Sequence, residues 1–192
     1  MADTNHGRES PKSLEKGGFL STMSRRDKFI FFIFGFFAGI LLTNATSAFV
    51  FQTAVVPVFS PEDGAEIIHF IDEAESTIDI QMFAFTSHDV VEALERANER
   101  GVKVRVILER DVNDNADTLS ELAAEGLLVR YAGGDFRRTH SKFIIRDERE
   151  VLVGSHNFSN SALFHNREAS VIISGPAVQE FIEIFEHDWN LA

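Results

Sequence analysis

The chain lacks cysteine altogether, and it has few basic residues for its length of 192. Without cysteine, neither a disulfide nor a zinc site built from thiolates can form, and the redox compartment stays open. Eighteen lysine and arginine residues against thirty aspartate and glutamate residues give a formal net charge of −12. The sequence also shows no internal repeat and no group of histidines and carboxylates with clear metal-ligand spacing. These absences exclude a disulfide scaffold and argue against a repeat array.

Positive charge is concentrated in one part of the chain. From Ser60 onward there are twelve basic and twenty-six acidic residues, yet seven basic and only five acidic residues lie between positions 130 and 168. A locally positive region on an acidic body can focus an anionic substrate. A protein that binds long nucleic acids usually shows a broader basic face, and none is visible here. The charge pattern therefore favours a compact anionic substrate.

The N-terminal third divides into a polar segment and an apolar one. Residues 1–27 are polar, low in aromatics and carry several basic residues, which is typical of a disordered tail. Phe29 to Leu42 is almost entirely apolar, and the run continues with polar interruptions to about Val58. Crossing a bilayer takes ~20 residues, and phenylalanine all round the helix argues against an amphipathic core helix. We expect a transmembrane anchor over 28–58 and a catalytic domain over 59–192.

The charges that flank this apolar run predict its orientation. Basic residues precede it, and none follows until Arg96, so the N-terminus should be cytoplasmic and the catalytic domain extracytoplasmic. Export is the alternative, because Ala45–Ala48 resembles a signal-peptidase site and Ser24–Phe29 loosely resembles a twin-arginine signal. The apolar stretch is longer than a usual signal core, which favours a retained single-pass anchor.

Beyond the anchor, helical and strand patterns alternate. The helical patterns are amphipathic, and the strand patterns are short and rich in β-branched residues. We expect helices over about 61–74, 87–101 and 113–124 and after 176, and strands over 77–85, 102–108, 127–131 and 169–173. Alternation of this kind predicts an α/β fold with a mixed, mostly parallel sheet flanked by helices.

Two apolar runs at 143–145 and 151–153 enclose a charged stretch and predict a β-hairpin. Because side chains alternate along a strand, His140 and Lys142 should share one face. A turn centred on residues 148–149 would place Lys142 opposite Ser155 and His140 opposite Asn157. Imidazole, ammonium, hydroxyl and carboxamide would then form a patch that can hold a tetrahedral oxyanion. The alternative is an ordinary hairpin with a solvated polar face.

The order and spacing of these residues favour the functional interpretation. The chain reads His140-x-Lys142-x4-Asp147, then Gly154-Ser155-x-Asn157, then Asn166-x-Glu168. This order resembles the phospholipase D superfamily, whose signature is H-x-K-x4-D followed by G-S/T-x-N. The resemblance runs from about Phe59 to the C-terminus and includes one motif, not two. The chain is therefore most similar to small single-motif members, namely the bacterial endonuclease of the family and the membrane-anchored mitochondrial cardiolipin hydrolase-like proteins.

The resemblance implies a role for each residue. His140 would attack phosphorus to form a phosphohistidine, and a second histidine would protonate the leaving group and later activate water. Lys142 and Asn157 would bind phosphoryl oxygens with support from Ser155. Glu168 would hydrogen-bond a histidine and fix its tautomer, as a triad carboxylate does. Since one imidazole cannot be both nucleophile and acid in one step, the resemblance implies a homodimer with two His140 side chains facing each other.

The last expectations concern Asp147, Gly154, the need for a cofactor and the substrate. We interpret Asp147, at the turn, and Gly154 as structural members of the motif, and the family needs no metal or other cofactor. The favoured substrate is a phospholipid head group at the membrane, because the anchor would hold the site near lipid. The alternatives are a membrane-anchored or exported metal-independent endonuclease acting on DNA or RNA, and a non-catalytic membrane protein that only binds anions.

Overall fold

The structure is a computed structural model that describes residues 23–50, 53–134 and 136–192. The chain divides into two compact units, residues 1–50 and residues 51–192. The first unit contains helix α1, Arg25–Val50. Among the described residues, no helix combines the length and the apolar character needed to span a bilayer, and the expected anchor is not confirmed. Residues 1–22 of the expected tail lie outside the described residues.

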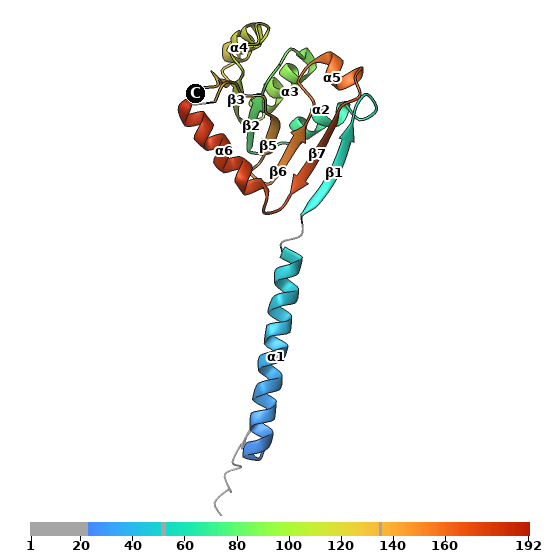
Figure 1. The fold of residues 1–192 in the computed structure, drawn as a ribbon, viewed down its shortest axis with the longest axis vertical. Coiled ribbons are helices and arrows are strands. Elements are labelled where there is room, and N and C mark those ends of the chain that lie inside the picture. Colours follow the sequence, from blue (N-terminus) through green and yellow to red (C-terminus); the bar gives the residue numbers. More distant parts are fainter. Residues whose placement is uncertain (1–22, 51–52, 135) are drawn as a thin grey trace, which may run out of the picture. The chain divides into compact units, whose positions relative to one another are not determined.

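In the described part of the second unit, seven strands form one sheet in the order β1-β7-β6-β5-β2-β3-β4 (Figure 1). The strands are β1 Ala54–Phe59, β2 Thr77–Met82, β3 Lys103–Leu108, β4 Leu128–Tyr131, β5 Lys142–Arg146, β6 Glu150–Gly154 and β7 Ala169–Ser174. Only the β2–β3 and β3–β4 pairs are parallel, and the other four neighbouring pairs are antiparallel. The sheet is mixed as predicted, but the expectation that it is mostly parallel is wrong.

The sheet is mostly antiparallel because of the β5–β6 hairpin and the pairing of strands β7 and β1 beside it. Helical crossovers join β2, β3 and β4, which gives parallel neighbours. The β5–β6 connection is a tight turn, and β7 adds antiparallel to β6. Strand β1 pairs antiparallel with β7, from Ala54 opposite Ser174 to Phe59 opposite Ala169. Its residues continue the apolar run of the expected anchor, so the sheet begins five residues before the predicted boundary at 59.

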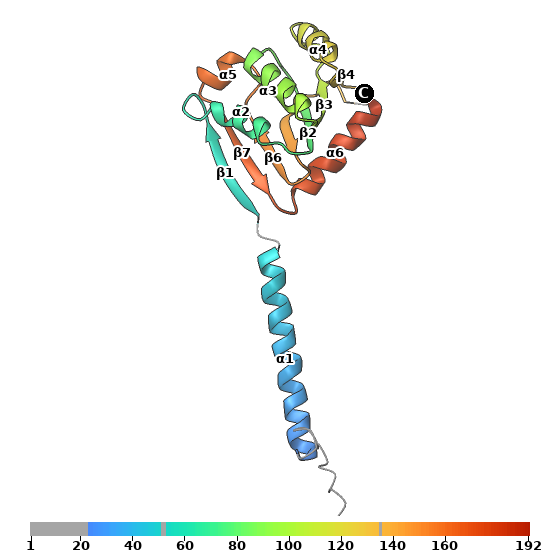
Figure 2. The same ribbon diagram turned by 180° about the vertical axis from the view of Figure 1, so that it is seen from behind.

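Helices cover both faces of the sheet. The described helices of this unit are α2 Ala65–Asp72, α3 His88–Glu99, α4 Asn115–Ala124, α5 Asn160–Phe164 and α6 Val178–Leu191. Helix α6 lies on one face, and α2 and α3 lie on the other (Figures 1 and 2). Alternation along β5 sends Ile144 into the core under α2 and α3 and sends Phe143 and Ile145 into the core under α6. Each such buried side chain stabilises the fold by roughly 1.5–3 kcal/mol.

The hairpin forms, but its register differs by one residue from the prediction. Arg146 pairs with Glu150 and Phe143 with Val153, so three residues form the loop. Asp147 and Glu148 adopt positive φ angles of 53° and 56°. Continuing this register places Gly154, and not Ser155, opposite Lys142. The predicted pairs Lys142–Ser155 and His140–Asn157 are therefore wrong.

Candidate active site

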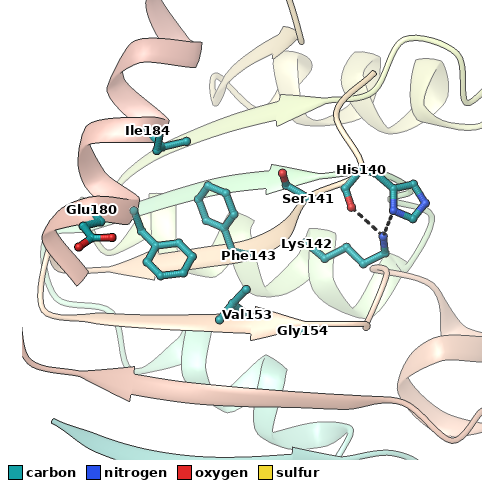
Figure 3. A pocket seen from close by; sticks show the side chains of 9 residues that line it. His140, Ser141, Lys142, Phe143, Val153, Gly154, Glu180 and Ile184 are labelled. Atoms are coloured by element: carbon teal, nitrogen blue, oxygen red, sulfur yellow. Dashed lines mark hydrogen bonds between the residues drawn. The ribbon is translucent and has the colours of Figure 1, made fainter. Parts of the chain in front are cut away.

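The start of β5 brings an imidazole and an ammonium together. Lys142 Nζ lies 3.3 Å from Nδ1 of His140 and donates a hydrogen bond to the His140 carbonyl oxygen at 3.0 Å (Figure 3). His140 is exposed, whereas the Lys142 side chain is buried, with 9% of its surface accessible. The prediction that these two side chains share a face is confirmed. An exposed nucleophilic nitrogen thus lies beside a partly desolvated cation.

Phe83, the residue that follows strand β2, lies beside both His140 and Lys142. Its ring centroid lies 4.3 Å from that of His140 and 5.1 Å from Lys142 Nζ. An ammonium over an aromatic face is stabilised by the ring quadrupole. No sequence pattern singles out Phe83, because an aromatic residue in a strand is more often part of a core. Here it limits the orientations that the His140 ring can adopt.

Burial lowers the pKa of Lys142, while the negative charge of Glu168 acts to raise it. The ammonium has donors only, so in its contact with Lys142 the Nδ1 atom of His140 acts as acceptor. In the neutral ring the proton then lies on Nε2. The tautomer of His140 therefore depends on which group contacts Nδ1.

A second pair of motif residues meets at the loop after β6. Ser155 Oγ donates to Glu168 Oε2 at 2.6 Å and accepts from the Ala169 N–H at 3.0 Å. Asn166 donates to the other oxygen of Glu168 at 3.3 Å. Ser60 Oγ accepts the N–H of Glu168 at 3.2 Å, which anchors its backbone. Within the described chain, the carboxylate of Glu168 is hydrogen-bonded to Ser155 and Asn166 and to no histidine.

Asn157 and His156 differ in their access to solvent. Asn157 is half-buried, and its carboxamide makes no hydrogen bond within the described residues. Its N–H donors are therefore free to bind an oxyanion. His156 is 1% exposed, its Nδ1 lies 2.6 Å from Ser170 Oγ, and burial lowers its pKa. His156 is thus a buried structural residue and cannot meet a substrate directly.

Asp147 and Gly154 shape the hairpin. Asp147 accepts hydrogen bonds from the N–H groups of Glu75, Ser76 and Thr77 at 2.7–3.2 Å, which ties the turn to the start of β2. Burial acts to raise the pKa of Asp147, but these backbone hydrogen bonds outweigh it and lower the pKa. A Cβ on Gly154 would lie 2.4 Å from the Ala169 carbonyl oxygen, so only glycine allows β6 and β7 to approach here.

A pocket of about 430 Å³ adjoins the His140–Lys142 pair and extends toward α6 (Figure 3). Its walls are mainly apolar, with His140 and Lys142 at one end and Glu180 and Ile184 on the helix. The described residues contain no group of three or more histidine, aspartate or glutamate side chains arranged to hold a metal ion. The pocket thus offers a nucleophile and a cation for a phosphoryl group at one end, with space for an apolar substituent.

Comparison with known proteins shows which proteins this chain is similar to. Residues 67–189 match the family described as "Cardiolipin synthase, PLD-like domain". Mitochondrial cardiolipin hydrolase from Mus musculus is 34% identical over 119 residues, covering 61% of this chain and 53% of the relative. Phospholipase D from Rickettsia conorii is 32% identical over 145 residues, covering 72% of this chain and 68% of that protein. The chain spans about half the length of the mitochondrial relatives that it matches.

Solved structures show the same fold. The crystal structure of Nuc from Salmonella typhimurium, described as a phospholipase D family member, aligns with a TM-score of 0.67 at 28% identity. The alignment covers 73% of this chain and 96% of that one. NucT from Helicobacter pylori aligns with a TM-score of 0.66 at 19% identity, covering 73% and 98%. The second unit of this chain therefore has the architecture of those complete chains.

Proposed function

Because this chain belongs to the phospholipase D superfamily, we propose that it is a phosphodiesterase in which His140 forms a covalent phosphohistidine. The observation that carries the proposal is the contact between the exposed His140 imidazole and the buried Lys142 ammonium at 3.3 Å. A nucleophile next to a cation can attack phosphorus while the cation binds the phosphoryl oxygens that gain charge.

The proposed reaction has two displacements. A nitrogen of His140 attacks phosphorus, the bond to the leaving oxygen breaks, and a second imidazole donates a proton to that oxygen. Water then attacks phosphorus, the N–P bond breaks, and the second imidazole takes a proton from the water. Lys142 and the Asn157 amide would bind the phosphoryl oxygens in both steps.

The second imidazole would come from another copy of the chain. Among the described histidines, His156 is buried against Ser170, and His165 lies at the end of α5 beside Asn160. No described histidine other than His140 contacts Lys142. A homodimer with two His140 side chains at one site supplies both chemical roles and has the two-fold symmetry common among oligomers.

Glu168 fits this arrangement as a partner across the interface. Attack by Nε2 requires the ring proton on Nδ1, and a carboxylate is the group that holds it there. Since Glu168 bonds Ser155 and no histidine of its own described chain, we assign it to His140 of the partner subunit. Formation of the dimer would then replace the Lys142 contact on Nδ1 with a carboxylate contact.

We favour a phospholipid as the substrate. The largely apolar pocket beside His140 and Lys142 suits the hydrophobic part of a lipid phosphodiester. The relatives named cardiolipin hydrolase and phospholipase D support the same class. The acidic surface charge supports it further, because long nucleic acids bind to broad basic faces.

A metal-independent endonuclease is the second candidate. Arg137 and Arg138 are exposed in the loop before His140, where they can contact a phosphate backbone. Purified protein should be incubated with phosphatidylcholine, cardiolipin, single-stranded DNA and RNA in the presence of chelator. Lipid turnover that is lost in His140→Ala supports the proposal. Salt-sensitive turnover of nucleic acid without lipid turnover supports the endonuclease instead.

We also propose that the N-terminal segment holds the catalytic unit at a membrane, on its extracytoplasmic side. The support is the apolar run Phe29–Leu42 and the basic residues before it. Protease treatment of intact cells, followed by carbonate extraction, tests this. An anchored extracytoplasmic protein resists extraction and is cleaved, whereas a protein released after signal cleavage is absent from the pellet.

A further inference from the structure

The residue before the proposed nucleophile is held by two independent hydrogen bonds. Thr139 is buried, its N–H donates to Glu109 Oε2 at 2.6 Å, and its Oγ1 accepts from Gln81 Nε2 at 2.7 Å. The other oxygen of Glu109 accepts the N–H of Asp111 at 3.0 Å. Thr139 is therefore fixed through both its backbone and its side chain.

The network reaches across the sheet to α6. Gln81, on β2, also donates from Nε2 to Asp188 Oδ2 at 2.9 Å, and Asp188 belongs to α6. Gln81, Glu109 and Asp188 are all buried. Polar groups held in a low-dielectric interior form strong, directional hydrogen bonds and rigidify their surroundings. The end of β2, the end of β3 and helix α6 thus converge on Thr139.

The residue after the nucleophile is held as well. The Phe83 N–H donates to the Ser141 carbonyl oxygen at 3.0 Å, which extends the β2–β5 pairing past Lys142. His140 therefore lies between two fixed neighbours although its own side chain is exposed. Among the described residues, its ring contacts Phe83 and Lys142. Its position depends on the backbone more than on packing around the ring.

We infer that Thr139, held by Gln81 and Glu109, is a positioning residue that sets where the His140 imidazole meets phosphorus. The inference rests on the proposed function, since it assumes that His140 is the nucleophile. It concerns residues outside the family motif, and none of the hydrogen bonds of Thr139, Gln81 and Glu109 described above involves His140 or Lys142. A displacement of ~1 Å at a reacting group can lower a rate by about a hundredfold, so such a network has a measurable kinetic effect.

The test compares two identical substitutions at buried threonines. Thr139→Val removes the acceptor for Gln81 but keeps the N–H bond to Glu109. Thr118→Val is the matched control, because Thr118, on α4, is also buried and its Oγ1 donates to the Phe85 carbonyl oxygen and not to a member of the Thr139–Gln81–Glu109 network. Steady-state kinetics on bis(p-nitrophenyl) phosphate and thermal unfolding should be measured for both.

The expected result separates positioning from stability. Thr139→Val should lower kcat by at least about tenfold with little change in KM, because the nucleophile is misplaced while phosphate binding remains. Thr118→Val should lower the Tm with kcat unchanged. Thr139→Ser, which keeps the hydroxyl, should restore kcat to within about threefold of wild type. Equal kcat values in the two valine variants would overturn the inference.

Gln81→Met and His140→Ala provide two further tests. If Thr139→Val does not fold, Gln81→Met, which removes the donor but leaves Thr139 in place, should show the same fall in kcat. An unchanged kcat in a folded Gln81→Met protein would overturn the inference. His140→Ala tests the proposed function separately: if it stays active, the nucleophile assignment fails and the inference fails with it. If it is inactive while Thr139→Val is fully active, only the positioning inference fails.

Discussion

Glu168 accepts its hydrogen bond from Ser155 at 2.6 Å, and the carboxylate that would orient a catalytic histidine thus faces a hydroxyl of its own chain. In the proposed mechanism, this relationship is the reason why one copy of the chain would be incomplete as a catalyst. The isolated subunit holds one exposed imidazole beside Lys142 and one carboxylate with no described histidine bound to it. A second copy would supply a second imidazole for the reaction and a histidine for Glu168.

Mixing active and inactive subunits tests this arrangement. If wild-type chains are co-expressed with an equal amount of differently tagged His140→Ala chains, only dimers with two imidazoles turn over. Specific activity per total chain should then fall to about one quarter, because the active fraction follows the square of the wild-type fraction. A decrease to about one half, in proportion to the wild-type chains, would show that each subunit works alone.

The dependence of kcat/KM on pH should reflect the deprotonation of the Lys142 ammonium group. Burial lowers the pKa of Lys142, so the ammonium loses its proton at a lower pH than the ordinary lysine value of 10.5. As the pH rises through this lowered pKa, phosphoryl binding is lost, and kcat/KM should fall.

Arginine at position 142 provides the control for this alkaline decrease in kcat/KM. Lys142→Arg stays charged throughout the range, so its residual activity should lack the alkaline decrease. A wild-type profile that stays flat up to the ordinary lysine pKa, or an arginine variant with the same alkaline limb, would contradict the assignment.

The Asp147 turn should contribute stability that depends on pH. Because its pKa is lower in the folded protein than the ordinary value of 3.8, the contribution is complete above that value. It is lost as the pH falls through the folded pKa. Asp147→Asn tolerates the positive φ but loses the charge, and should lower the free energy of unfolding at neutral pH by about 1–3 kcal/mol.

Chemical denaturation over a range of pH measures this difference. The gap between wild type and Asp147→Asn should close in acid, as wild-type Asp147 becomes protonated. Glu148→Gln is the matched control, since Glu148 is the next residue, also has a positive φ and is exposed. An equal loss of stability in both variants would show that the carboxylate of Asp147 has no special role.

A charge in the apolar pocket should distinguish lipid from small substrates. Ile184 is exposed and lines the pocket, so Ile184→Glu should lower turnover of phosphatidylcholine vesicles by about tenfold, equivalent to ~1.4 kcal/mol. Turnover of bis(p-nitrophenyl) phosphate should change little. Leu128→Glu, at an exposed leucine on β4 outside the pocket, serves as the control. Equal effects of the two variants on vesicles would remove the pocket from the proposal.

The sequence predicted the parts of the site that depend on local pattern. Alternation along β5 was enough to place His140 and Lys142 on one face, and the apolar periodicity located most strands and four of the five described helices of the second unit, but not α5. These features need only neighbours in sequence or a regular period.

Contacts between distant residues decided what the sequence did not predict. The hairpin loop takes three residues because Asp147 binds backbone groups of Glu75–Thr77, about seventy positions away. A one-residue change of register is enough to exchange Ser155 for Gly154 opposite Lys142. Strand β1 was assigned to the anchor because its apolar residues follow another apolar run. Only pairing with β7 identifies it as a strand.

The most direct test of the account is a rapid acid or base quench during turnover, followed by mass spectrometry of the peptide that contains residue 140. The account predicts a phosphoryl adduct on His140 that forms and decays at rates consistent with kcat, and that is absent in His140→Ala. Turnover at the wild-type rate with no adduct on His140 under either quench would contradict it.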